Sequence, residues 1–164
     1  MEFTFFWNGP FSQWDSSPFM ALDGLMYSCA EQYMMAQKAL LFQDKETFKK
    51  IMATTHPRDQ KKLGRTVKNF NQVIWNTYST TIVYDGNLLK FSQNPKHWDL
   101  LNATGDSILV EASPFDRIWG IGLPEGDRLA NNISTWKGQN RLGFILTKVR
   151  ETIRDENVHG DESK

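Results

Sequence analysis

The sequence lacks the features that mark secreted, disulfide-bonded or membrane-spanning proteins. It has a single cysteine, Cys29, which excludes an internal disulfide and a cysteine-based zinc site. No run approaches the roughly 20 apolar residues that are needed to span a bilayer. Residues 1–11 lack the basic start of a signal peptide. We therefore expect a protein of the cytoplasm, a reducing compartment, with no membrane association.

Net charge is also absent. Lys plus Arg and Asp plus Glu each number 19 in a chain of 164 residues, so no overall field attracts nucleic acid or membrane. An anionic ligand would have to be held by a local cluster of basic side chains. Aromatic residues, in contrast, are abundant, with six Trp and eleven Phe, and aromatic rings both build cores and stack on flat ligands.

Motifs for metals, phosphate loops and activated nucleophiles are missing as well. Three scattered histidines and one cysteine offer no metal-ligand spacing. There is no G-x-S-x-G, no P-loop and no dinucleotide-binding G-x-G-x-x-G. The G-x-G at residues 120–122 does not follow a strand and open a helix. We therefore expect neither a metal nor a cofactor, and no serine or cysteine nucleophile.

The stretch from Ser28 to Phe42 is the feature around which the chain is organised. Ser28 and Glu31 form an S-x-x-E pattern, which predicts a capping box at the start of a helix. Helical spacing places five residues on one face: Glu31, Met34, Met35, Lys38 and Phe42. Glu31 could serve only as a cap, and Lys38 could extend from the edge of the core. A pair of opposite charges on one apolar face is, however, more typical of a functional site.

The remaining pattern predicts one domain, residues 1–154, followed by a polar tail, residues 155–164. Helices are expected from Asp44 to Met52, from Pro57 to Gly64, from Pro95 to Leu101 and from Gln139 to Arg154, and short strands at residues 3–7 and 108–111 with a hairpin about Asp23-Gly24. Residues 113–124 form a long loop rich in Gly, Pro and aromatics. Local rules conflict over residues 71–91, since Tyr78 to Tyr84 favours a strand while the wider segment has a helical apolar stripe.

The remaining chemical inventory fits hydrolysis of a glycosidic bond. It consists of three carboxylates, one lysine on a helix, a basic run and many aromatics. Carboxylates such as Glu31, Glu111 and Asp116 stabilise an oxocarbenium-like centre or activate water. Lysine and arginine hold phosphates, and aromatic rings stack on a base.

The order and content of several sequence blocks resemble the NADAR, or YbiA-like, family. The resemblance runs from about Phe5 to Ile153 and is carried by the blocks EQYMMAQKA at 31–39, KLGR at 62–65 with Trp75 downstream, KFSQNP at 90–95, ATG at 103–105, LVEAS at 109–113, DRIWGIG at 116–122 and QNRLG at 139–143.

This resemblance implies a mainly α fold, a single compact helical domain with short β-strands and a hairpin. It favours a long helix from Asn71 to Lys90 over the strand. Members are N-glycosidases: some remove ADP-ribose from guanine bases, and others cleave phosphoribosylamino-pyrimidine intermediates of riboflavin synthesis. We expect the first activity, on ADP-ribose linked to a nucleoside or nucleic acid, with the second as the alternative. A module that binds such compounds without cutting them is the alternative of another class, and no obligatory protein partner is evident.

Three residues are the catalytic candidates: Glu31, Lys38 and Asp116. In one route a carboxylate, Glu31 or Asp116, stabilises positive charge and directs water. In the other, which we favour, Lys38 attacks the opened sugar and forms a Schiff base. A lysine nucleophile must be neutral, and burial among apolar side chains lowers its pKa.

The candidates for substrate binding are spread over the chain. Lys62 and Arg65 are assigned to phosphate, although a basic run is also typical of a solvated face. Trp75 and Trp119 are assigned to the pocket wall, although either could be core. The remaining candidates are Ser12 and Trp14 in the first loop, Gly120 in the long loop, and Asn140 and Arg141, where the start of the last helix favours an anion.

Overall fold

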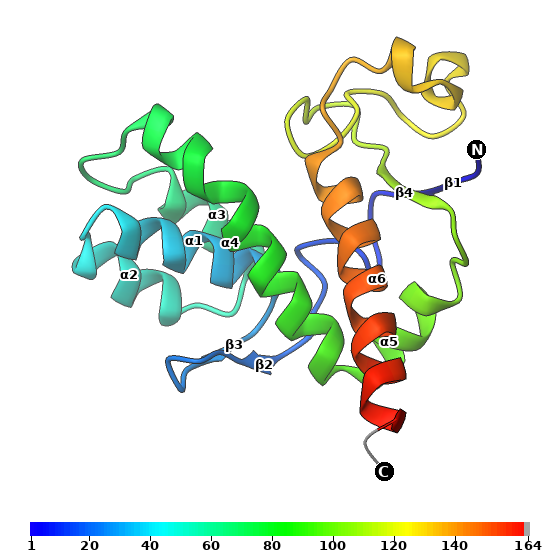
Figure 1. The fold of residues 1–164 in the computed structure, drawn as a ribbon. Helices are drawn as coiled ribbons and strands as arrows, with labels where there is room; N and C mark the ends of the chain where they lie inside the picture. Colours follow the sequence, from blue (N-terminus) through cyan, green and yellow to red (C-terminus); the bar gives the residue numbers. More distant parts are fainter. Residues whose placement is uncertain (163–164) are drawn as a thin grey trace. The chain divides into compact units, whose positions relative to one another are not determined.

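Helix α1, from Ala30 to Leu41, is the element on which the helical part of the molecule is assembled. In the computed structural model, which describes residues 1–162, three other helices pack against α1 (Figure 1). They are α2 (Lys45–Met52), α3 (Pro57–Gly64) and α4 (Gln72–Gln93). The predicted central helix is therefore confirmed, and it is the common partner of its neighbours.

The chain divides into two compact units by its internal contacts. One unit, here called the helical unit, is Gln13–Asn94. The other, here called the split unit, combines Met1–Ser12 with the chain from Pro95 onward. Helices dominate the described residues and the strands form two two-stranded sheets, so the mainly α prediction is confirmed.

The helix caps and the hairpin turn that the sequence predicts in the helical unit are present in the structure. The Asp44 carboxylate accepts a hydrogen bond from the Thr47 N–H at 3.0 Å and caps α2. Asn71 caps α4 in the same way through the Ile74 N–H, also at 3.0 Å. Strands β2 (Phe19–Met20) and β3 (Met26–Tyr27) pair antiparallel around the Asp23-Gly24 turn. Each of these elements therefore begins or turns at the residue type that the sequence predicted.

Helix α4 resolves the conflict over residues 71–91 in favour of a helix. Its buried residues fall at helical spacing: Trp75, Ser79, Val83, Gly86, Asn87, Lys90 and Phe91. A strand from Tyr78 to Tyr84 would have placed Thr81 on the same face as Ser79 and Val83, whereas Thr81 is exposed. Packing of one face against α1 thus outweighs the local preference of the β-branched residues.

The predicted capping box of Ser28 and Glu31 is wrong. The N-cap of α1 is Cys29, and its side chain makes no capping bond. The Ser28 N–H instead donates to Gln32 Oε1 at 2.7 Å, one residue further along than the box requires. The Glu31 N–H donates to the backbone oxygen of Gln13 at 2.9 Å. The first turn of α1 is therefore completed by the segment before it, and not by its own serine.

Two glycines allow the helices to approach α1 closely. A Cβ atom on Gly64 of α3 would lie 2.0 Å from Met35 Sδ, and one on Gly86 of α4 would lie 2.6 Å from Tyr33 Cδ1. A side chain at either position would require Met35, Tyr33 or the helix itself to shift. The close packing buries Met34 and Met35, as the apolar face predicted.

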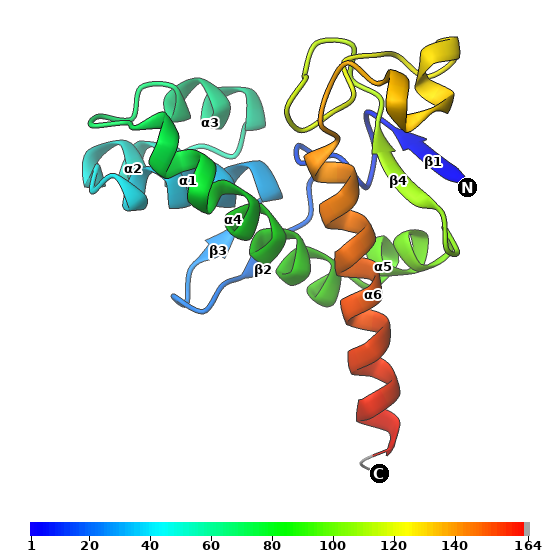
Figure 2. The same ribbon diagram turned by 45° about the horizontal axis from the view of Figure 1, so that its top comes forward.

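The split unit joins segments that are far apart in the sequence. Strand β1 (Phe3–Phe6) pairs parallel with β4 (Ile108–Glu111), with Phe3 opposite Ile108 (Figure 2). A cluster of buried residues lies beside this pair: Val110, Ile121, Leu123 and Ala130. The rest of the unit is α5 (Pro95–Asn102), the short 3-10 helices η1 (Arg128–Asn131) and η2 (Ile133–Thr135), and α6 (Arg141–Glu162).

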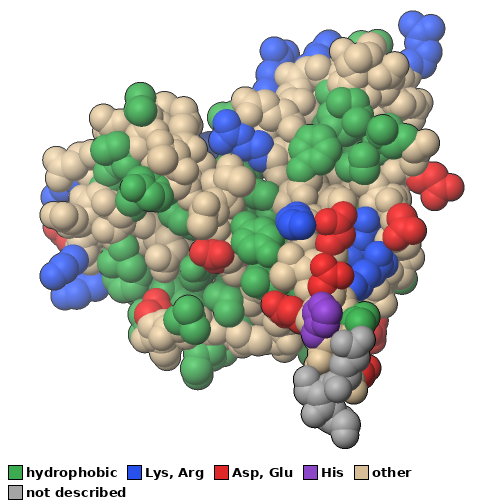
Figure 3. All heavy atoms as spheres, viewed as in Figure 1, with side chains coloured by type: hydrophobic (Ala, Val, Ile, Leu, Met, Phe, Trp, Pro, Cys, Tyr) green, Lys and Arg blue, Asp and Glu red, His purple; other side chains and the backbone are tan. Residues whose placement is uncertain are grey.

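Helix α6 buries the predicted stripe: Leu142, Ile145, Leu146, Val149 and Ile153. Acidic and basic side chains lie together along its outer surface in Figure 3, consistent with the Lys148–Glu151 pair at 3.6 Å. The helix continues past Arg154 to Glu162, while the last two residues of the predicted tail lie outside the described residues. The division into a domain and a tail at residue 154 stays a prediction. Among residues 1–162, no helix combines the length and apolar character needed to cross a membrane.

Gly143 provides a test of how α6 packs on β4. A Cβ atom there would lie 2.1 Å from the Leu109 backbone oxygen and 2.3 Å from Asn140 Oδ1. Gly143→Ala should therefore lower the urea midpoint of unfolding strongly, although alanine is the better helix former by about 1 kcal/mol. Gly160→Ala on the same helix meets nothing within 4 Å and should leave the midpoint unchanged or raised. Equal effects of the two substitutions would show that α6 does not approach β4 this closely.

Candidate active site

Lys38 lies near the end of α1, and its amine lies over two aromatic rings. Its Nζ atom is 4.6 Å from the centroid of the Phe70 ring and 5.6 Å from the Trp75 ring. Trp75 is buried on α4, whereas Phe70 is partly exposed, and the Phe70 ring also packs edge-on against Phe42. The lysine amine is therefore half-buried against ring faces, where a cation is attracted but poorly hydrated.

This environment shifts the pKa of Lys38 below its ordinary value. Burial is the largest cause, because it disfavours the charged ammonium. The Glu31 carboxylate raises the pKa of Lys38, and the Arg65 guanidinium lowers it. The structure thus brings two predicted site residues, Glu31 and Arg65, within electrostatic reach of a third, Lys38. A lowered pKa increases the fraction of neutral amine, which is the nucleophilic form.

Glu31 is buried in the first turn of α1, and the residue is 6% exposed. Its position is fixed from outside the helix, because its backbone N–H donates to Gln13. Burial on the helix face of Lys38, within electrostatic reach of its amine, makes Glu31 a group suited to proton transfer or charge stabilisation. The predicted pair of Glu31 and Lys38 is therefore present on one side of α1.

The basic residues of the predicted phosphate grip lie at the end of α3. Lys62 and Arg65 are both exposed, and their three-residue spacing places them on neighbouring positions of the helix surface. Lys61 extends over the ring of Trp14, with Nζ 6.0 Å from its centroid, and Trp14 is 44% exposed. These groups offer positive charge and an open aromatic face within the helical unit.

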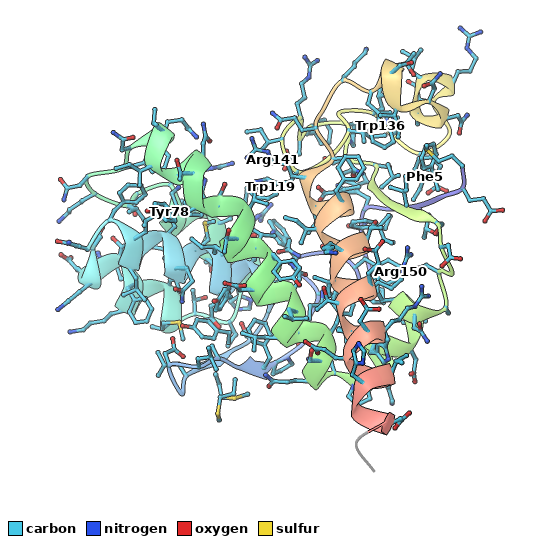
Figure 4. All side chains as sticks on the ribbon, viewed as in Figure 1. Phe5, Tyr78, Trp119, Trp136, Arg141 and Arg150 are labelled. Carbon is cyan, nitrogen blue, oxygen red and sulfur yellow. The ribbon has the colours of Figure 1, made fainter. Side chains whose placement is uncertain are left out.

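The other predicted residues belong to the split unit. Asp116 orders the long loop: its Oδ1 accepts the N–H groups of Ile118 at 2.9 Å and Trp119 at 2.8 Å. The Arg141 guanidinium lies over the Trp119 ring at 5.9 Å, and the two side chains are neighbours in Figure 4. Ser12 lies in the first turn, where its N–H donates to Gly9.

Asn140 and Gly120 have clear roles in the architecture of the split unit. Asn140 is fully buried, its Oδ1 accepts the Glu111 N–H at 2.9 Å and its Nδ2 donates to the Leu109 oxygen at 3.0 Å. Gly120 accepts the Asn140 N–H, and a Cβ atom on Gly120 would lie 2.9 Å from the Glu111 oxygen. These contacts fasten the long loop and the start of α6 to β4.

Sequence reasoning gave no role to Phe70, which supplies the ring closest to Lys38. It precedes the N-cap Asn71, so only its position at the start of a long helix could have drawn attention to it. Within residues 1–162, no group of three or more His, Cys, Asp and Glu side chains is arranged to hold a metal ion. The available chemistry is that of a desolvated lysine, a buried carboxylate, basic side chains and aromatic rings.

These features define a class of small, mainly α proteins that carry a half-buried lysine and a buried carboxylate on one helix. The model of the NADAR domain matches residues 2–154. The chain therefore belongs to the NADAR family.

Named relatives extend over most of the chain. It is 49% identical over 145 residues to N-glycosidase R617 of Acanthamoeba polyphaga mimivirus, covering 86% of this chain and 85% of that protein. It is 33% identical over 129 residues to N-glycosidase Npun_R5314 of Nostoc punctiforme, covering 79% and 76%. The NMR structure of the Escherichia coli protein YbiA superimposes with a TM-score of 0.78 at 26% identity, covering 96% of this chain and 88% of that one. The YbiA-like fold is thereby confirmed.

Glu31 and Arg65 have opposite effects on the pKa of Lys38, so substituting each of them should shift this pKa in opposite directions. Glu31→Gln removes a group that raises the pKa of Lys38, so this pKa should fall further; Arg65→Gln removes one that lowers it, so the pKa should rise. NMR titration of reductively ¹³C-methylated lysines, with Lys38→Arg used to assign the resonance, measures both shifts. Arg58→Gln, an exposed change at the other end of α3, is the matched control. Shifts in the same direction would contradict the electrostatic arrangement.

Proposed function

We propose that this protein is an N-glycosidase that removes ADP-ribose from ADP-ribosylated guanine. The observation that carries the proposal is the half-buried Lys38, whose amine lies over Phe70 and Trp75, with Glu31 and Arg65 within electrostatic reach. The names of the relatives, N-glycosidases, support cleavage of a bond between a sugar and a nitrogen base. The buried lysine and carboxylate favour catalysis over binding alone, since holding a ligand requires neither.

The proposed reaction uses Lys38 as a nucleophile. The ribose ring opens first, so that its oxygen takes up the proton of the guanine nitrogen and the anomeric carbon becomes double-bonded to that nitrogen. The neutral Lys38 amine adds to this carbon, and the bond from the carbon to the guanine nitrogen breaks, with its electron pair leaving on the base. Both amine protons pass to the base, a transfer that we assign to Glu31, and the lysine nitrogen and the carbon remain joined as a Schiff base. Water then adds to its carbon and releases free ADP-ribose and Lys38.

The basic end of α3 supports a substrate with a diphosphate. Lys62 and Arg65 are neighbours on the exposed surface of the helix, and Arg65 is also within electrostatic reach of Lys38. Two adjacent cations suit two linked phosphates better than one. This arrangement favours ADP-ribose over a substrate that carries a single phosphate. Asp116, Trp119, Gly120, Asn140, Arg141, Ser12 and Trp14 remain proposed contributors.

A product assay with trapping tests the chemistry. The full chain is incubated with ADP-ribosylated guanosine, and free guanosine and ADP-ribose are quantified. Lys38→Met and Glu31→Gln should each reduce kcat by roughly a hundredfold or more, and the double variant should lose little further, as groups serving one step do. Borohydride added during turnover should reduce the Schiff base and add the sugar mass to the peptide that contains Lys38.

Other outcomes of this assay would contradict parts of the proposal. Binding of ADP-ribose without release of guanosine would make the protein a binding module. Release from the riboflavin intermediate alone would assign the other substrate. If Lys38→Met is inactive but borohydride traps no sugar adduct on the unchanged enzyme, the carboxylate route would apply, with Lys38 as a positioning charge.

The phosphate assignment has its own test. Arg65→Ala should weaken the affinity for ADP-ribose by roughly tenfold or more, because it removes a charge-assisted hydrogen bond. Arg58→Ala, in the same basic run, is the control and should bind as the unchanged protein does. Titration calorimetry measures both, and thermal unfolding checks that each variant is folded. Equal affinities would show that the run is only a solvated face.

A further inference from the structure

Lys90, on the buried face of α4, is a charged side chain to which the proposed chemistry gives no role. It is 0% exposed, and its Nζ atom lies 5.0 Å from the centroid of the Phe91 ring. Burial of an ammonium group is costly, and a methionine of similar shape would fill the same space without that cost. The presence of lysine here therefore calls for an interaction that depends on its charge.

Two titratable groups act on the Lys90 ammonium, and both lie next to the start of α1. Burial lowers the pKa of Lys90 to about 8; the Asp15 carboxylate opposes this shift, as does Cys29 when it is a thiolate. Asp15 belongs to the segment Gln13–Ser17, and Cys29 is the N-cap of α1. The charge of Lys90 therefore acts on the segment that leads into the helix of Glu31.

A second contact joins the same segment to α4 one turn before Lys90. The side-chain amides of Gln13 and Asn87 exchange two hydrogen bonds, at 3.0 and 3.2 Å. Asn87 is fully buried and also donates to the Val83 oxygen at 2.8 Å. Asn87 and Lys90 are three residues apart, so they lie on one face of the helix.

The segment in turn holds the first turn of α1. The backbone oxygen of Gln13 accepts the Glu31 N–H at 2.9 Å. At the other end, the Ser17 N–H donates to the Ser28 backbone oxygen at 3.1 Å, and Ser17 Oγ donates to the Asp15 backbone oxygen at 2.9 Å. A chain of contacts thus runs from α4 through residues 13–17 to the backbone of Glu31.

We propose that Lys90 and Asn87 are positioning residues that hold segment 13–17 against α4 and thereby fix Glu31 for the reaction at the anomeric carbon. This inference rests on the proposed function, because it assigns Glu31 to that reaction. Neither residue touches the substrate; both act through Gln13 and Asp15. A catalytic group displaced by about 1 Å loses roughly a hundredfold in rate, so a small movement of this segment is sufficient to affect kcat.

The charge of Lys90 gives the proposal a specific dependence on pH. The charged ammonium attracts the Asp15 carboxylate, and this attraction is lost as the pH rises through about 8. The kcat of the unchanged enzyme should therefore fall on the alkaline side. Lys38 acts in the opposite sense, since it must be neutral and its contribution rises with pH. The contributions of Lys90 and Lys38 to the pH profile of kcat can thus be distinguished, because the first falls and the second rises with pH.

The test compares three variants of the full chain with one control. Lys90→Met should fold at least as stably as the unchanged protein but lose roughly tenfold to a hundredfold in kcat, with KM within about twofold. Lys90→Arg stays charged, so its falling limb should move to higher pH while part of kcat is retained. Asn87→Ala should lower kcat, and Asn76→Ala, an exposed position on the same helix, should not. The assay is release of guanosine from ADP-ribosylated guanosine.

Amide hydrogen exchange separates failure of the positioning from failure of the proposed function. Peptides covering residues 28–34 should exchange faster in Lys90→Met and Asn87→Ala than in the unchanged protein or in Asn76→Ala, with no substrate required. If these variants exchange faster but the unchanged protein releases no guanosine, the proposed reaction is wrong, while the contact between segment 13–17 and the start of α1 is supported. Folded variants with unchanged exchange, kcat and pH profile would overturn the inference.

Discussion

Close approach to α1 is the constraint on which the helical unit depends. Gly64 lets α3 reach Met35, and Gly86 lets α4 reach Tyr33, at separations that a side chain could occupy only if these neighbours shifted. Because α1 is enclosed in this way, its charged residues cannot be fully hydrated. Glu31 is buried, and Lys38 has its amine against Phe70 and Trp75. The reactivity of this helix is therefore a consequence of how tightly its neighbours pack.

The state of Lys38 is set by a balance of opposing effects. Burial and Arg65 favour the neutral amine, and Glu31 favours the ammonium. A lysine without the carboxylate would be neutral more often but would lack a group to exchange protons with. A lysine without the burial would remain charged and hydrated at neutral pH. The arrangement gives the amine both a lowered pKa and a carboxylate to exchange protons with, which suits a residue that must attack, release a proton and be regenerated.

Much of the fold could be predicted from local sequence patterns. The predictions that were wrong failed for physical reasons. Asp44, Asn71 and the Asp23-Gly24 turn could be recognised because the signal and its effect lie within a few residues. The capping box failed because Gln13, distant in the sequence, satisfies the Glu31 N–H. The face shared by Glu31 and Lys38 followed from helical spacing, whereas the proximity of Phe70 depends on how the chain returns between α3 and α4. Lys90 belonged to a recognised block, but its burial could not be known without the packing of α4.

The parallel pairing of β1 with β4 has a consequence for how the chain is made. Phe3 is paired with Ile108, so the first strand emerges from the ribosome long before its partner exists. Residues 13–94, in contrast, are synthesised without interruption and contain their own helix contacts. During translation the helical unit can assemble early, while β1 waits as an apolar, unpaired strand edge. Pairings of high sequence separation form slowly, so substitutions in β1 or β4 should act on the yield of folded protein before they act on chemistry.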